Sequence, residues 1–140
     1  MNPMLNKALR AYNQVEVETV IEQASPHKLV LMLFEGAIKS ANQALLHMKN
    51  REIAAKGQAL SRTIRIIEEG LKISLDHEQG GKLAEQLDSL YDYMLRQLLL
   101  ASLRNDGEIL REVIQLLSDL RDAWAAMEQQ ATASLEVATP

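Results

Sequence analysis

The sequence has 140 residues, of which 47% are hydrophobic and only 4% aromatic, and it contains six glycines, three prolines and no cysteine. Fifteen basic and nineteen acidic residues give a net charge of −4. This length corresponds to one domain, and the shortage of turn residues argues against an all-β fold. The acidic balance argues against a surface for duplex nucleic acid, and the missing cysteines exclude disulfides, thiolate zinc sites and cysteine nucleophiles.

The absence of long apolar stretches bears on where the protein works. No stretch approaches the roughly 18 uncharged apolar residues of a membrane span, and no apolar signal core is found near the N-terminus. A chain without cysteine is also more natural in a reducing compartment than as a small secreted domain. We therefore expect a cytoplasmic protein without membrane insertion.

Residues 1–24 are predicted to form a polar arm that contains a short amphipathic helix. Val17, Val20 and Ile21 recur at the spacing of one helical face. Tyr12 lies in the looser chain before them. The arm therefore carries a small apolar face of its own.

Two helices are predicted in the first half of the domain. Ser25 is a good N-cap, and Pro26 follows at the first helical position, where its missing N–H costs nothing. This helix should run to about Met48. Asn50 is suited to cap the second helix, which should run to about Leu75.

Two more helices are predicted in the second half. The pair Gly80-Gly81 ends a loop over 76–81, and a third helix should follow over about 82–103. Asp106 caps a fourth helix over about 108–130. Short connections make consecutive helices antiparallel. We therefore predict an all-α fold, an antiparallel up-down-up-down four-helix bundle over 25–131, preceded by the arm and followed by a flexible tail over 132–140.

The polar residues form no recognisable catalytic or metal-binding motif. None of His27, His47 and His77 belongs to an H-E-x-x-H or Glu-x-x-His arrangement, so we interpret all three as surface residues. A phosphate-binding glycine loop is also missing. The sequence therefore predicts no enzyme, no metal and no cofactor, and directs attention to what the surface binds.

The second and third helices carry more apolar residues than one core face needs. At 100° per residue, the second helix has a core stripe and a second, opposite stripe, and the wet face of the third helix becomes apolar after Arg96. Antiparallel packing brings the surplus residues of the two helices together. They are Ala55, Ala59, Ile66 and Ile73 in the second helix and Leu99, Leu100 and Leu103 in the third.

Such an apolar trough on the outside of a bundle is typical of a partner site, in which a helix or extended chain is laid into a groove. Two interpretations stay open: the second helix is covered, for example by the arm, or it forms a docking groove for another chain. Both can hold at different times. Dimerisation through the same trough is a further alternative.

The order and spacing of several motifs resemble the flagellin-specific export chaperones, the FliS family. Phe34 and Glu35 stand where the family tends to have Tyr-Asp, so any hydrogen bond of that tyrosine hydroxyl is lost. The matching residues are Tyr12, 24–29, 31–38, 74–76, Gly80-Gly81, 90–94 and 120–124.

The resemblance implies a cytosolic helical bundle that binds the disordered C-terminal segment of flagellin in a 1:1 complex. It implies that the chaperone blocks premature polymerisation and delivers flagellin to the flagellar type III export apparatus. It also implies that the arm around Tyr12, Val17, Val20 and Ile21 covers part of the binding surface until the client displaces it. A helical adaptor or dimeric scaffold is the alternative, and a second flagellar protein or an anti-sigma factor stays open as a further partner.

Overall fold

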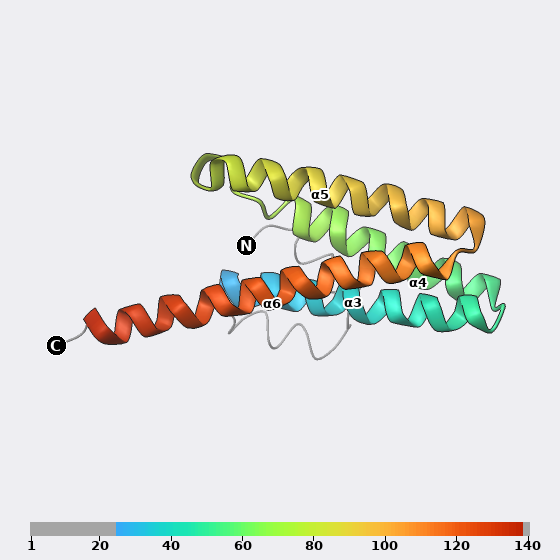
Figure 1. The fold of residues 1–140 in the computed structure, drawn as a ribbon, viewed down its shortest axis with the longest axis horizontal. Helices are drawn as coiled ribbons and strands as arrows, with labels where there is room; N and C mark the ends of the chain where they lie inside the picture. Colours follow the sequence, from blue (N-terminus) through green and yellow to red (C-terminus); the bar gives the residue numbers. More distant parts are fainter. Residues whose placement is uncertain (1–24, 139–140) are drawn as a thin grey trace.

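The computed structural model describes residues 25–138, with side chains for residues 25–127. The chain in this range is helical throughout apart from short turns, which confirms the all-α prediction (Figure 1). The predicted arm, with Tyr12, Val17, Val20 and Ile21, lies outside the described residues. The helices are α3 (Pro26–Lys49), α4 (Ile53–Ile66), the π-helical segment η1 (Ile67–Lys72), α5 (His77–Arg104) and α6 (Gly107–Ala138).

Side-chain contacts show how the helices are oriented. Lys56, near the start of α4, donates from Nζ to Asn105 Oδ1 (3.0 Å) just beyond the end of α5. His27, in the first turn of α3, is bonded through Nε2 to the carbonyl oxygen of Trp124 in the second half of α6 (2.9 Å). In Figure 1 the chain correspondingly reverses direction after each helix, and α3 packs between α4 and α6.

Two of the predicted caps are present. Ser25 Oγ accepts from the backbone N–H of Lys28 (3.1 Å), with Pro26 in the first turn. Asp106 Oδ1 accepts from the backbone N–H of Glu108 (2.9 Å). Each bond satisfies a backbone donor that the first helical turn leaves without a partner. These helix starts are therefore determined locally by the sequence.

The start of α4 differs from the prediction. Asn50 is the C-cap of α3 and does not cap α4. Glu52 occupies the N-cap position of α4, and its side chain forms no cap bond. The reason lies between them, because Arg51 adopts a left-handed backbone conformation with φ of 59°. The chain turns at Arg51, so the second helix begins later than expected.

The region of the predicted loop over 76–81 is mostly helical and contains one local break. Asp76 caps a single helical turn from His77, and helical conformation is then interrupted at Gly81, with φ of 50° and ψ of −122°. A residue with a side chain adopts this backbone region only with strain, so glycine is suited to it. The predicted break is found at Gly81, whereas 77–80 are helical.

The second predicted helix is not α-helical throughout. It ends as an α-helix at Ile66 and continues as the π-helical segment η1, Ile67–Lys72. A π-turn accommodates one more residue than an α-turn. The spacing of 100° per residue therefore does not carry over from Ile66 to Ile73, and the two residues do not belong to one continuous α-helical stripe.

The interior is formed by apolar side chains from all of the described helices. Within it, Ser40 of α3 and Thr63 of α4 share a buried hydrogen bond of 2.6 Å, which satisfies both hydroxyls. Helix α6 continues to Ala138, beyond its predicted end near Gln130. The largest fully buried side chains are Leu33, Phe34, Ile66, Ile67, Leu71, Met94, Leu98, Leu110, Val113 and Leu117, with Thr63 among them.

Helix α3 is the one described helix that is long and apolar enough to satisfy a length-and-hydropathy test for a membrane span. Half of its apolar window is buried inside the bundle, and Leu29, Leu33 and Ala37 belong to the core cluster. Its apolar character is thus explained by its position, because a helix packed on several sides needs more than one apolar stripe.

Candidate functional site

The end of α5 and the start of α4 lie next to each other, and each carries exposed apolar side chains. Lys56 joins these two segments, since its Nζ also reaches the carbonyl oxygen of Ser102 (3.4 Å). Here Leu99 and Leu103 are 57% and 77% exposed, and Ile53 is 76% exposed. We call these three residues the leucine face.

Exposure of large apolar side chains to water is unfavourable, and covering them with a partner would be favourable. Leu100 and Ala55 from the predicted trough are half-buried beside the leucine face. The structure thus places the α5 part of the trough, and its neighbour Ala55, at the surface. Ile53 is the first residue of α4 and was not among the residues predicted for the trough.

The remaining members of the predicted trough are less accessible. Ala59 is 5% exposed and Ile66 has no exposed surface, while Ile73 is half-buried beyond the π-helical segment. Because the adjacent Ile67 is also fully buried, α4 is enclosed on more than one side at this level. A partner can reach Ala59 and Ile66 only if the packing around them changes.

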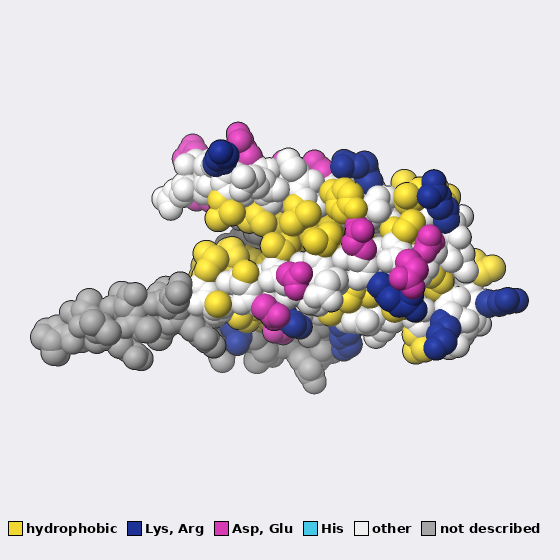
Figure 2. Space-filling model, viewed as in Figure 1, with side chains coloured by type: hydrophobic (Ala, Val, Ile, Leu, Met, Phe, Trp, Pro, Cys, Tyr) yellow, Lys and Arg dark blue, Asp and Glu magenta, His cyan; other side chains and the backbone are white. Residues whose placement is uncertain are grey.

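A second apolar surface lies between α5 and α6 and was not anticipated. Figure 2 shows hydrophobic side chains gathered along a hollow where the first half of α5 separates from the second half of α6. Leu83 of α5 is 54% exposed and Met127 of α6 is 48% exposed. We call the surface between these residues the α5–α6 seam. Neither residue was among those predicted for the trough, because helical periodicity does not show where two helices diverge.

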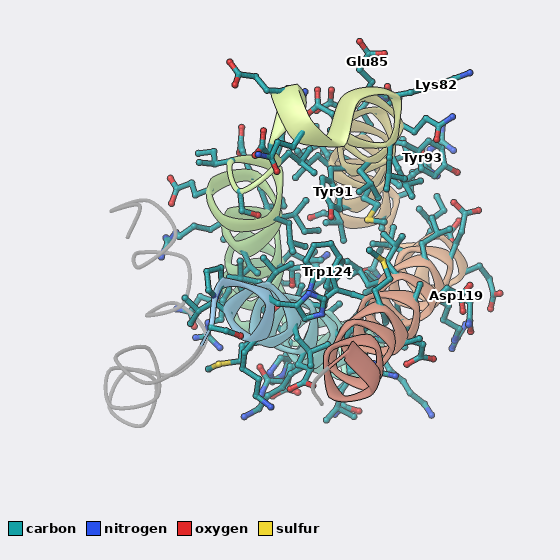
Figure 3. All side chains as sticks on the ribbon, turned by 90° about the vertical axis from the view of Figure 1, so that its left-hand side faces the viewer. Lys82, Glu85, Tyr91, Tyr93, Asp119 and Trp124 are labelled. Atoms are coloured by element: carbon teal, nitrogen blue, oxygen red, sulfur yellow. The ribbon has the colours of Figure 1, made fainter. Side chains whose placement is uncertain are left out.

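An aromatic contact joins the start of α3 to the second half of α6. Trp124 Nε1 donates to the carbonyl oxygen of His27 (3.0 Å), and the two rings stack with centroids 4.6 Å apart. Figure 3 shows Trp124 between α3 and α6. His27 is half-buried and bonded, so its interpretation as a surface residue is wrong. A tryptophan indole N–H needs a partner when buried, and the α3 backbone supplies it.

Tyr93 links α5 to α6, because its hydroxyl donates to Glu112 Oε1 of α6 in a short hydrogen bond. This bond raises the pKa of the Tyr93 hydroxyl, since it favours the protonated form. The neighbouring Tyr91 lies on the inner side of α5 (Figure 3) and is buried, which raises its pKa as well. A hydrogen bond thus accounts for the shift at Tyr93, and burial accounts for the shift at Tyr91.

Charged groups elsewhere act as braces between helices. Lys72 of η1 pairs with Asp88 (2.7 Å) and Asp92 (3.3 Å) of α5, and the hydrogen bond to Asp88 raises the pKa of Lys72. Among the described side chains, no three His, Asp or Glu residues gather in a way that could hold a metal ion. The features that stand out in the described part of the protein are therefore apolar surfaces suited to another chain.

This combination of a helical bundle and exposed apolar surfaces defines a protein-binding helical domain. Residues 8–131 match the family model described as "Flagellar protein FliS". The chain belongs to the FliS family, as the sequence resemblance predicted.

Several curated relatives have the FliS name, and this chain matches them over most of their length. The chain is 47% identical to the flagellar secretion chaperone FliS of Salmonella typhimurium over 124 residues, which covers 89% of this chain and 92% of the relative. It is 43% identical to that of Escherichia coli, covering 84% and 87%, and 35% identical to that of Bacillus subtilis, covering 81% and 80%. The family is thus one of flagellar secretion chaperones, which is not an enzyme class.

Proposed function

We propose that this protein is a cytosolic export chaperone that binds the disordered C-terminal segment of flagellin in a 1:1 complex. It keeps the subunit from polymerising early and delivers it to the flagellar type III export apparatus. The leucine face carries the proposal, because Leu99 and Leu103 remain 57% and 77% exposed in a chain whose family is named for flagellar secretion.

An outer surface suits a client that must later be released. A disordered segment loses conformational freedom when it binds, so its affinity per unit of buried area is modest and it can be removed stepwise. Leu99 and Leu103 follow each other by one helical turn and present a row along α5. An amphipathic client segment laid along this row would bury side chains at the same spacing.

The arm is the proposed competitor of the client. Its apolar face of Val17, Val20 and Ile21, with Tyr12, has the same helical spacing as a client segment would need. Deleting residues 1–20 should therefore leave flagellin affinity unchanged or raise it. A large loss of affinity in isothermal titration would show that the arm contacts the client instead of competing with it.

The direct test is the mass of the protein in solution. Light scattering behind a size-exclusion column should give a monomer for the free protein and a 1:1 complex after addition of a flagellin C-terminal peptide. A dimer that does not respond to the peptide would contradict the proposal and favour a scaffold that associates through the same surface. A peptide of the same composition in scrambled order serves as the control.

A further inference from the structure

The end of the bundle where the α3–α4 and α5–α6 turns meet contains a hollow that the proposed flagellin site does not use. Its volume is about 480 Å³. Leu45 and Met48 of α3 form its apolar floor, and a Cβ added at Gly107 would lie 3.3 Å from Leu45 Cδ1. The start of α6 therefore sits directly against the end of α3, and the hollow is open on its outer side.

Four basic side chains line this hollow. They come from three different segments: Lys49 and Arg51 from the α3–α4 turn, Arg104 from the end of α5, and Arg111 from α6. Figure 2 shows Lys and Arg side chains gathered over this end of the molecule. In a protein of net charge −4, this is a local reversal of sign.

The acidic residues of the hollow are already engaged. Asp106 caps α6 by accepting from Glu108 N (2.9 Å), and the Glu108 carboxylate pairs with Arg111. Lys49, Arg51 and Arg104 form no ion pair with another described residue. The lining thus holds four cations and two carboxylates, which leaves an excess of two positive charges around the apolar floor.

The backbone at Arg51 closes the end of α3, where Arg51 N–H donates to the Met48 carbonyl oxygen (3.2 Å) and Glu52 N–H to that of His47 (2.9 Å). Its φ of 59° lies in the left-handed region, where glycine would be accommodated without strain. Arginine occupies this helix-ending position although glycine is the usual residue there. Here the side chain lines the hollow, together with Asn105, whose φ is 51°. These two are the only non-glycine residues with positive φ in the described range.

We propose that this hollow, which we call the basic hollow, docks an acidic peptide segment of a partner protein. Carboxylates of the segment pair with Lys49, Arg51 and Arg104, and one apolar side chain lies on Leu45 and Met48. An extended peptide fits better than a small anion, because the cations stand around the edge of an open surface and none is buried. The proposal goes beyond flagellin binding and does not depend on it.

The test uses the full chain and a fluorescein-labelled peptide of glutamate, aspartate and leucine, followed by fluorescence anisotropy. A peptide in which lysine replaces the acidic residues is the control. The acidic peptide should bind and the basic one should not. Because exposed charge pairs are screened by salt, affinity should fall when ionic strength rises from about 0.05 M to about 0.3 M. Equal binding of both peptides, or affinity independent of salt, would overturn the proposal.

Matched charge reversals locate the site. The double variant Arg51→Glu/Arg104→Glu should weaken acidic-peptide binding by about tenfold, as two partly exposed ion pairs would. The control Arg62→Glu/Arg65→Glu changes the net charge equally on the exposed side of α4 and should bind as the wild type does. An equal loss in both variants would show only a general effect of charge.

Arg51→Gly separates binding from folding. Glycine relieves the backbone strain, so the midpoint of urea unfolding should stay or rise while acidic-peptide binding falls. A fall in stability with unchanged binding would make Arg51 a structural residue and refute its role.

Two further measurements distinguish the possible partners. Flagellin binding by the Arg51→Glu/Arg104→Glu variant should be unchanged. This measurement distinguishes a failure of the basic-hollow proposal from a failure of the flagellin proposal. Vesicles containing phosphatidylserine should not bind the wild type. Vesicle binding without peptide binding would replace the peptide by a membrane surface and contradict the proposal.

Discussion

Truncating the leucine face should weaken client binding without unfolding the protein. We consider the double variant Leu99→Ala/Leu103→Ala. Alanine favours the α-helix and both side chains are mostly in solvent, so each change should alter the free energy of unfolding by less than about 0.5 kcal/mol. Any loss of affinity would then reflect lost contacts with the client.

The expected size follows from the exposed fractions. Each substitution removes three carbons, and a buried methylene is worth about 0.8 kcal/mol. Leu99 and Leu103 have 57% and 77% of their surface still available for a client to cover. Complete coverage would therefore contribute about 3 kcal/mol from the two side chains, which corresponds to a rise in Kd of about a hundredfold.

The assay is isothermal titration with a flagellin C-terminal peptide, beside urea unfolding followed by circular dichroism. The matched control is Leu98→Ala, one residue away on α5 but without exposed surface. This control should lower the free energy of unfolding by about 2–5 kcal/mol because it leaves a cavity. If Leu99→Ala/Leu103→Ala binds flagellin as tightly as the wild type, the leucine face is not the site.

Three further predictions concern stability. Trp124→Phe removes the indole donor to the His27 carbonyl and should lower the free energy of unfolding by about 1 kcal/mol in urea titrations followed by circular dichroism; an unchanged value would show that this bond contributes nothing. Because burial raises the pKa of Tyr91, the folded state retains its proton when the unfolded chain begins to lose it near pH 10, so stability is complete below that pH and declines above it. Tyr91→Phe should reduce this decline in urea titrations between about pH 9 and pH 11, and identical slopes would refute the cause. A Cβ at Gly57 or Gly81 would meet no atom within 4 Å, but only Gly81 has positive φ. In thermal unfolding, Gly57→Ala should therefore raise the free energy of unfolding by about 1 kcal/mol, and Gly81→Ala should lower it by about 1–2 kcal/mol. Changes of the same sign would contradict this reasoning.

Local signals predicted much of the fold. Ser25 and Asp106 mark helix starts because capping depends on side chains and backbone groups only a few residues apart. Gly81 marks a break because its backbone conformation suits glycine. The π-helical segment η1 was not predictable from spacing, since the extra residue in its turn becomes visible only when the segment is packed.

Helical spacing also identified part of the candidate site. Leu99 and Leu103 stood out because they replaced polar residues on the wet face of a helix, and they are exposed. Ile66 followed the same logic but is buried, because periodicity shows which side of a helix is apolar and not whether something covers that side. Leu83 and Met127 were missed because they lie on core stripes whose helices separate at their ends.

The sequence by itself determined the all-α class, the main helix boundaries and, through its motifs, the FliS family. These properties are encoded in short-range spacing and in the order of residues along the chain. Only the tertiary structure decided which apolar stripes remain in water, that His27 is tied to Trp124, and that four basic side chains from separate segments surround one hollow. Burial and charge clustering depend on residues far apart in sequence, so they appear only when the helices are packed.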